Sequence, residues 1–319
     1  MIRNKISKGF KDYLPHIKLQ LVRNKIVYFV AFLLLGSLVW YLFIKPYDYS
    51  VSIISKTFPG TINQSIKVWG NTNENTVLLQ EKDFLNIDQQ LKFNDSIYRY
   101  QWKITPANDS TTKIKVYITD ADHSLGNRLK IPFLDTDFEK RTKSTILDFN
   151  HALTEHLEKF KVTVIDTLQQ LPDTYCAFIP VKASQLGKAK GMMQNYPILS
   201  TVLVDNNVTL NGRPFLEITN WNRKVDSVSY NFCYPIIKSD SLPQNDIIKY
   251  KKFKGVRALK AIYNGNYITS DRAWYALLDY AKRNGIEVWE RPVEVFFSNP
   301  NFGGNELDWI AEIYMPLKE

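Results

Sequence analysis

The sequence has few residues of the kinds that most metal sites and covalent catalysis require. Its 319 residues include two cysteines and four histidines. The HExxH motif of zinc proteases, a glycine-rich phosphate-binding loop and a serine–histidine–aspartate order are all absent from it. We therefore expect no metal ion and no cofactor, and the remaining functional candidates are pockets and carboxylates.

The two cysteines form no metal-binding or redox motif. Cys176 and Cys233 lie in separate strand-like runs, without CxxC spacing and without a cluster of other ligands. Two states stay open. The pattern favours buried free thiols, and a disulfide would require an oxidising compartment and two neighbouring strands.

The net charge of +9 is concentrated at the N-terminus. Residues 1–25 hold seven basic side chains and one acidic one, Asp12. Without these and Lys45, the chain keeps 33 of its 41 basic and 31 of its 32 acidic residues. A nearly neutral remainder excludes the basic surface that nucleic-acid binding requires, so we expect no nucleic-acid partner.

Residues 26–44 (IVYFVAFLLLGSLVWYLFI) contain no charged side chain, and nineteen such residues suffice for a membrane-spanning helix. Tyr28, Trp40 and Tyr41 lie toward its ends, where interfacial aromatic residues are enriched. A cleaved signal peptide would have a shorter apolar run and a small-residue cleavage site, but KPYDY follows at residues 45–49. A buried core helix would not be apolar on all faces beside a basic tail. The sequence predicts a single-pass membrane protein.

The basic flank also predicts the orientation of this helix. Because basic residues stay on the cytoplasmic side of a membrane, we expect residues 1–25 to be a cytoplasmic tail. The bulk of the chain is then periplasmic or extracellular.

Residues 46–165 have the pattern of a sheet curled around a long helix. A strand-like run at residues 47–54 precedes a turn and a short helix at 61–69. Further strand-like runs are separated by asparagine-rich and aspartate-rich turns, at residues 76–79, 90–93, 97–104 and 112–119. A helix over residues 136–160 follows, with an apolar stripe made by Phe138, Ile146, Phe149, Leu153, Leu157 and Phe160.

This order resembles the START-like, polyketide-cyclase-like (SRPBCC) superfamily, which has a helix-grip fold. The resemblance rests on the layout of about 120 residues, with Phe58-Pro59, Trp69, residues 100–102 and the final helix as its markers. Such a fold implies an apolar space between sheet and helix. In a diverged copy we expect this space to be filled by side chains.

The long helix carries two histidines that do not form a metal-binding pair. His151 and His156 are five residues apart, which separates them by about 140° around a helix. Metal-binding pairs on a helix are spaced i, i+4 instead. We expect His151 on a solvated face and His156 on the apolar stripe, as a neutral, hydrogen-bonded histidine.

Residues 166–319 contain an internal repeat. Residues 228–236 (VSYNFCYPI) align with residues 309–317 (WIAEIYMPL) on their prolines, so that Asn231 matches Glu312. Helix-like segments at residues 184–195 and 270–283 lie between the strand-like runs of each half. The sequence therefore predicts an α+β fold in which a βαββ unit occurs twice, with a shared cleft where the two copies meet.

Three segments of this second unit resemble the gyrase-inhibitor-like (GyrI-like) small-molecule-binding domain, also known as the AraC effector-binding domain. The strand ending in an aromatic-x-Gly-x-Tyr turn is residues 256–267, with YNGNY at 263–267. The Glu-Val-aromatic strand is residues 294–296, and the final Glu-Ile-Tyr strand is residues 312–314. The resemblance covers about 150 residues. Since the chain has no DNA-binding helices, a role in transcription does not carry over.

The resemblance implies a ligand at Glu312, because the last-strand glutamate of that family meets cationic or polar groups of lipophilic molecules. On an extended strand Ile310, Glu312 and Tyr314 point one way, and Ala311, Ile313 and Met315 the other. The second set is apolar and suits a face beneath helices. We predict a ligand site made by Glu312, Tyr314, Tyr263, Asn231, Tyr267 and Glu294. In the alternative interpretation Glu312 pairs with a local basic residue such as Arg291.

Three classes of function remain open. The first is a membrane-anchored binding or sensing protein for a lipophilic molecule, including a cationic one. The second is a hydrolase of strained electrophiles, because some relatives of the domain use a cleft glutamate to activate water; its candidate residues are Glu312, Glu294 and Tyr263. The third is a non-catalytic scaffold of the cell envelope. An open cleft favours the first two, and a sealed one favours the scaffold.

The orientation of the chain is directly testable. Removal of residues 1–45 should give a soluble protein with both units folded, because the remainder is nearly neutral and has no second long apolar run. A compartment-sensitive reporter fused after Glu319 should report a position outside the cytoplasm. A cytoplasmic signal from that fusion would contradict the orientation deduced from the basic tail.

Overall fold

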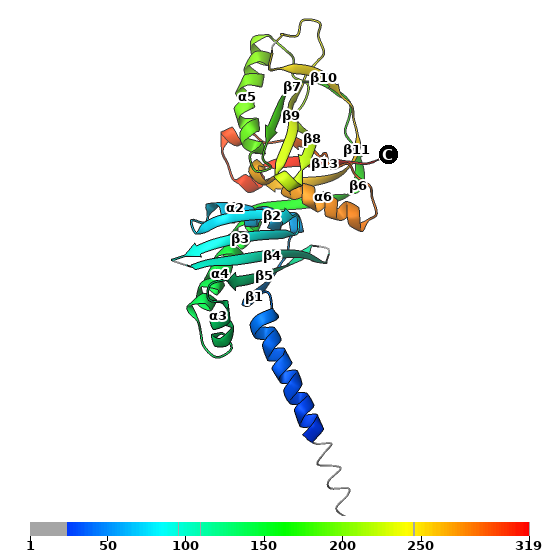
Figure 1. The fold of residues 1–319 in the computed structure, drawn as a ribbon. Coiled ribbons are helices and arrows are strands. Elements are labelled where there is room, and N and C mark those ends of the chain that lie inside the picture. The colour runs from blue at the N-terminus through cyan, green and yellow to red at the C-terminus, as the bar shows by residue number, and fades with distance from the viewer. Residues whose placement is uncertain (1–23, 95, 109, 245, 319) are drawn as a thin grey trace, which may run out of the picture.

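The computed structural model describes residues 24–318 apart from residues 95, 109 and 245, so almost all of the predicted basic tail at residues 1–25 lies outside the described residues. The fold is α+β, with two antiparallel sheets and one apolar helix near the N-terminus. Figure 1 shows the two sheets in separate units, with the apolar helix extending from the first of them.

The apolar helix covers Asn24–Ile44 and ends in a π-helical turn, η1 (Trp40–Ile44). It is the one helix among the described residues that is long and apolar enough to cross a membrane. Its last turn contacts Arg128, whose Nη1 donates to the carbonyl oxygen of Leu42 at 3.0 Å and whose Nε donates to Asp48 at 2.7 Å. Helix carbonyls without intrahelical partners favour such a cation, so Arg128 ties the helix end to the first unit.

The first unit contains a five-stranded sheet. In chain order its elements are β1 (Tyr49–Ser55), α2 (Pro59–Thr72), β2 (Thr76–Asp83), β3 (Asn86–Phe93), β4 (Ser96–Asn108), β5 (Thr111–Asp120), α3 (Ser124–Lys130) and α4 (Asp137–Glu158). The strands lie in the order β1-β5-β4-β3-β2. Each strand-like run expected in this region falls within one of these strands, except that β1 starts two residues later than expected.

Helix α4 packs on this sheet through the predicted stripe. Its N-cap Thr136 accepts a hydrogen bond from the Glu139 backbone, and the buried side chains on its inner face are Phe138, Thr142, Ile146, Phe149 and Leu153. Aromatic rings are buried in the core that helix and sheet share, including Trp69, Tyr100 and Trp102. Phe160, expected at the end of the stripe, instead begins a strand of the next sheet.

The second unit contains an eight-stranded sheet. Its elements are β6 (Phe160–Gln170), β7 (Thr174–Ala183), α5 (Lys188–Asp205), β8 (Phe215–Asn222), β9 (Ser227–Pro235), β10 (Lys249–Phe253), β11 (Arg257–Gly265), α6 (Arg272–Arg283), β12 (Val293–Phe296) and β13 (Ile310–Pro316). Short 3₁₀ turns are η2 (Arg223–Val225), η3 (Tyr267–Thr269), η4 (Pro300–Phe302) and η5 (Glu306–Asp308). The boundary expected at residue 165 falls inside β6, which pairs with β11.

The strands of this sheet lie in the order β10-β7-β9-β8-β12-β13-β11-β6. Strands β8 and β12 are paired at its centre. Helix α5 extends ten residues beyond the predicted end and contains Pro197. Leu199 and Leu203 are fully buried beyond that proline. Their packing outweighs the local disfavour of proline for a helix.

The two units meet through α2, α4 and α6, as the positions of α2 and α6 in Figure 1 indicate. Gly60 of α2 lies against the ring of Tyr275, and a Cβ at this glycine would overlap that ring. Arg272 Nε donates to His156 Nε2 at 3.1 Å across the same interface. Close backbone approach and a buried polar contact together fix one unit on the other.

The two helix histidines occupy different environments. His151 is exposed, whereas His156 packs beside Phe160 with a ring-centroid separation of 5.1 Å. Burial and the nearby Arg272 guanidinium lower the pKa of His156 to about 4. His156 is therefore neutral at pH 7 and accepts the hydrogen bond from Arg272.

Truncation of the two histidines should have unequal effects. His151→Ala should change the free energy of unfolding by no more than about 0.5 kcal/mol, as is usual for a solvated surface site. His156→Ala should cost roughly 0.5–3 kcal/mol, because it removes a ring packed on Phe160 and the acceptor for Arg272. Chemical denaturation measures both values. Equal effects, or one stoichiometric zinc lost in the double variant, would contradict these roles.

Acid should destabilise the chain through His156. Its pKa is lower in the folded protein than the ordinary value of 6.5, so the unfolded state binds more protons between pH 6.5 and about 4. The stabilisation is complete above pH 6.5 and falls as pH drops toward 4. Denaturation experiments at several pH values in this range give the free energy of unfolding as a function of pH. This free energy should rise less steeply with pH in His156→Ala than in the wild type. Identical slopes would exclude the histidine as the cause.

Candidate aromatic binding site

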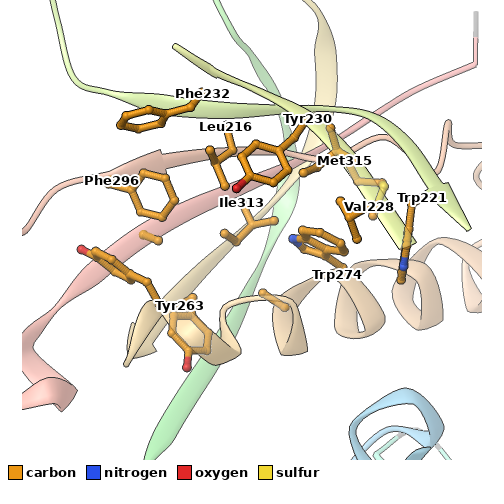
Figure 2. Close-up of a cluster of buried hydrophobic side chains, with 14 of the residues drawn as sticks. Leu216, Trp221, Val228, Tyr230, Phe232, Tyr263, Trp274, Phe296, Ile313 and Met315 are labelled. Atoms are coloured by element: carbon orange, nitrogen blue, oxygen red, sulfur yellow. The ribbon is translucent and has the colours of Figure 1, made fainter. Parts of the chain in front are cut away.

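One face of the eight-stranded sheet is covered by α5 and α6. Alternate residues of β9 point to this face, with Val228, Tyr230 and Phe232 all buried. On β13, Ala311, Ile313 and Met315 lie on the same side, as predicted for the set beneath helices. Figure 2 shows this core, with Phe232 and Phe296 at one end and Trp221 and Trp274 toward the other. We call it the helix-covered face.

A pocket of about 230 Å³ opens beside this core, between α5, β9 and the segment that follows β12. We call it the aromatic pocket. Its lining residues are Met192, Met193, Tyr196, Arg213, Pro214, Phe232, Tyr234, Tyr267, Phe296, Phe297, Ser298, Asn299, Pro300 and Asn301. Met193 is 57% exposed and Phe297 is 37% exposed, so the pocket is accessible from solvent.

Local hydrogen bonds position the wall of this pocket. The Tyr267 hydroxyl donates to the Ile310 carbonyl at 2.7 Å and accepts from the Ser298 backbone at 3.1 Å. Asn299 caps η4 by accepting from the Asn301 backbone at 3.0 Å. The tyrosine and the cap hold residues 297–301 against the start of β13, so the outer rim of the pocket is ordered.

The lining is apolar apart from a few hydroxyl and amide groups and one cation. Among the described lining residues Arg213 is the single charged side chain, and its guanidinium lies 4.2 Å from the centroid of the Phe297 ring. Burial raises the pKa of the Tyr234 and Tyr267 hydroxyls, so both stay neutral at pH 7. No carboxylate is among the described lining residues.

A buried ion pair lies next to the pocket wall. Lys188, at the start of α5, places its Nζ 2.8 Å from Glu294 Oε2 and 2.6 Å from Ser270 Oγ. Trp274 Nε1 donates to the other carboxylate oxygen at 2.6 Å. The Lys188 and Glu294 side chains are 1% and 0% exposed. Both charges are thus compensated inside the protein.

The opposite face of the sheet carries Glu312, where Lys260 approaches within 2.7 Å and the Tyr314 hydroxyl donates at 2.6 Å. The local partner is therefore Lys260, not Arg291. Asn231 lies on the same face and donates to Glu217, which also pairs with Lys251. Local partners thus account for these polar groups without a ligand.

The sheet separates the predicted site residues into two groups. In the β12–β13 pairing Glu294 is opposite Ile313, and Val295 is opposite Glu312. Since directly opposed residues share a face, Glu294 and Glu312 point to different sides. Tyr263, opposite Ala311, lies with Glu294 on the helix-covered face. The candidate hydrolytic residues Glu312, Glu294 and Tyr263 do not come together around one water.

Of the predicted ligand residues, Tyr267 lines the aromatic pocket. Glu294 and Tyr263 are buried in the neighbouring core. Glu312, Tyr314 and Asn231 form the polar groups of the opposite face, and their ligand role stays a prediction. The pocket residues that the sequence did not indicate come mainly from α5, β9 and residues 296–301. Alternation along β9 was a usable signal, because it places Phe232 on the helix-covered face.

The cysteines contribute no further site. Both are free and buried, on the neighbouring strands β7 and β9. They pack with Phe215 and Phe253 in a small core on the face that carries Glu312. Within the described part of the chain, no three His, Cys, Asp or Glu side chains are grouped as a metal site would need.

No protein-family model matches this sequence, and a search of curated proteins gives no match. A search of solved structures gives matches that cover about half of the chain. The EcmrR C-terminal domain is 15% identical over 50% of this chain and 98% of its own, with a TM-score of 0.43. SAV2435, solved with bound tetraphenylphosphonium, is 16% identical over 48% and 93%, with a TM-score of 0.35. A hydrolase from Listeria innocua is 11% identical over 48% and 92%, with a TM-score of 0.33.

Proposed function

We propose that this chain is a membrane-anchored protein that binds lipophilic small molecules in the aromatic pocket. The observation that carries the proposal is the lining, in which rings and methionines from α5, β9 and residues 296–301 surround an accessible space. Pockets for small ligands combine an apolar wall with a few polar groups that fix orientation. Here the polar groups are the tyrosine hydroxyls, Ser298, the asparagines and Arg213.

The flexible part of the lining suits ligands of varied shape. Met192 and Met193 are unbranched and adapt to irregular surfaces, while Phe232, Phe296 and Tyr267 provide fixed aromatic faces. The proposal also agrees with the GyrI-like sequence segments, which imply a small-molecule-binding domain.

The helix Asn24–Ile44 supports the anchor, because it is long and apolar and none of its residues is buried. With this helix in a membrane, the first unit lies next to the bilayer and the second unit is the more distant one (Figure 1). We place both units outside the cytoplasm, on the positive-inside argument. The aromatic pocket then faces an aqueous compartment and not the bilayer.

Hydrolysis has less support. The proposed water-activating carboxylates would have to share a water, but Glu294 is fully buried and Glu312 lies across the sheet. A purely structural scaffold would not require an accessible aromatic pocket. Small-molecule binding is the function that the described geometry supports best.

Binding should depend on the exposed wall of the pocket. Phe297→Ala removes one aromatic contact, so the affinity for a lipophilic probe such as 2-tert-butylnaphthalene should fall by about 0.5–1.5 kcal/mol. Equilibrium dialysis of the full chain in lipid nanodiscs, with empty discs subtracted, measures this change. Phe302→Ala is the matched control, because Phe302 is 88% exposed and lies outside the described lining.

The same assay tests the site implied by the sequence resemblance. There, Glu312→Gln would weaken binding of a lipophilic cation by roughly 1.5–3 kcal/mol, as for a hydrogen bond to a charged group. A ligand in the aromatic pocket should be insensitive to this change. Loss of binding in Glu312→Gln, with no change in Phe297→Ala, would move the site to the opposite face and refute the pocket assignment.

A further inference from the structure

Lys188 occupies a place where a cationic ligand could otherwise be bound. Its Nζ is 2.8 Å from Glu294 Oε2 and lies 5.5 Å from the centroid of the Trp274 ring. A carboxylate beside an aromatic face is the arrangement that recognises organic cations. In this protein the cation of that arrangement belongs to the chain itself.

Lys188 lies at an unfavourable position for a buried cation, so its stability there depends on the groups that it contacts. It is the first residue of α5, where the positive end of the helix dipole disfavours a basic side chain. Its side chain is nevertheless 1% exposed. The compensating interactions are those with Glu294, Ser270 and the Tyr267 carbonyl oxygen, which lies 3.4 Å from Nζ.

The pair is directly connected to the aromatic pocket. Glu294 and Phe296 alternate on β12 and so share a face, and Phe296 lines the pocket. Tyr267 also lines the pocket, with its ring centroid 4.8 Å from that of Phe296, and its carbonyl oxygen accepts from Lys188. Phe296 and Tyr267 therefore lie between the lining of the pocket and the residues around Glu294.

The other carboxylates of the repeat strands are compensated in the same way. Strands β7, β8, β9, β11, β12 and β13 carry three carboxylates, Glu217, Glu294 and Glu312. Each pairs with a lysine, respectively Lys251, Lys188 and Lys260. These strands therefore offer a cationic ligand no carboxylate without a counter-ion, and Arg213 adds a positive charge at the pocket.

We propose that Lys188 is a specificity residue that satisfies Glu294 from within the chain, so that the aromatic pocket selects uncharged lipophilic molecules and excludes lipophilic cations. This inference rests on the proposed binding function of the pocket. Removing the lysine while keeping the glutamate would leave a buried carboxylate beside the pocket. Such a group strongly favours an incoming cation.

The test compares an isosteric ligand pair on the full chain in lipid nanodiscs. The uncharged member is 2-tert-butylnaphthalene, and the cationic member is trimethyl(naphthalen-2-yl)ammonium, with empty discs subtracted. Wild-type protein should bind the uncharged member at least about tenfold more tightly, a difference of about 1.4 kcal/mol. Lys188→Met should reverse this preference by gaining affinity for the cation.

Two controls isolate the carboxylate. Lys188→Met combined with Glu294→Gln removes both charges and should not gain cation binding. Lys260→Met likewise leaves a carboxylate, that of Glu312, without its lysine, but on the opposite face of the sheet. This change should not alter the preference of the pocket for the uncharged ligand. Because Lys188→Met leaves a buried charge and can unfold the protein, the wild-type ligand ratio is a second test, in which equal binding of the two ligands overturns the inference.

The outcomes separate the inference from the proposed function. Wild-type protein that binds the cation as tightly as its uncharged isostere overturns the inference and leaves the binding function intact. A folded Lys188→Met that gains nothing for the cation also overturns it. Wild-type protein that binds neither ligand overturns the proposed function, and the inference falls with it.

Discussion

The buried ion pair between Lys188 and Glu294 is the contact on which the shape of the second unit depends. It joins the first residue of α5 to β12, and Ser270 and Trp274 bring the start of α6 to the same two charges. Helix α5 and β12 supply two walls of the aromatic pocket, so the pair sets their separation. A buried charge without its partner costs several kcal/mol, and this penalty makes the arrangement specific.

Much of the fold follows from local pattern. Alternation located β4 and β5, and the stripe Phe138, Ile146, Phe149 and Leu153 located α4. The predicted element boundaries were wrong where a contact with a distant part of the chain decides which of two local structures forms. Phe160 continues the helical spacing of α4, but pairing of β6 with β11 draws it into a strand. The helix-like segment was expected to end at residue 195, but α5 continues through Pro197 to Asp205, where Leu199 and Leu203 are buried.

The site was predictable in part for the same reason. Alternation placed Ala311, Ile313 and Met315 beneath helices, and the structure has them there. The alternation of residues along a strand does not show which face of the sheet holds a pocket. Apolar residues lie on both faces, because a second small core containing Phe215 and Val293 covers part of the face that carries Glu312. Nor does a sequence reveal ion-pair partners that are far apart along the chain. Lys188 and Glu294 are 106 residues apart, and Lys260 and Glu312 are 52 apart.

The contact of Arg128 with the end of the apolar helix has a mechanical consequence. Arg128 holds the Leu42 carbonyl oxygen and Asp48 together, while Tyr41 donates back to the Arg128 carbonyl oxygen at 3.2 Å. These contacts make the connection between the helix and the first unit stiff, whereas a glycine-rich linker would be flexible. At the far side of the first unit, the close packing of Gly60 on Tyr275 forms a second stiff joint. A change in the direction of the apolar helix would therefore move both units together, and the aromatic pocket with them.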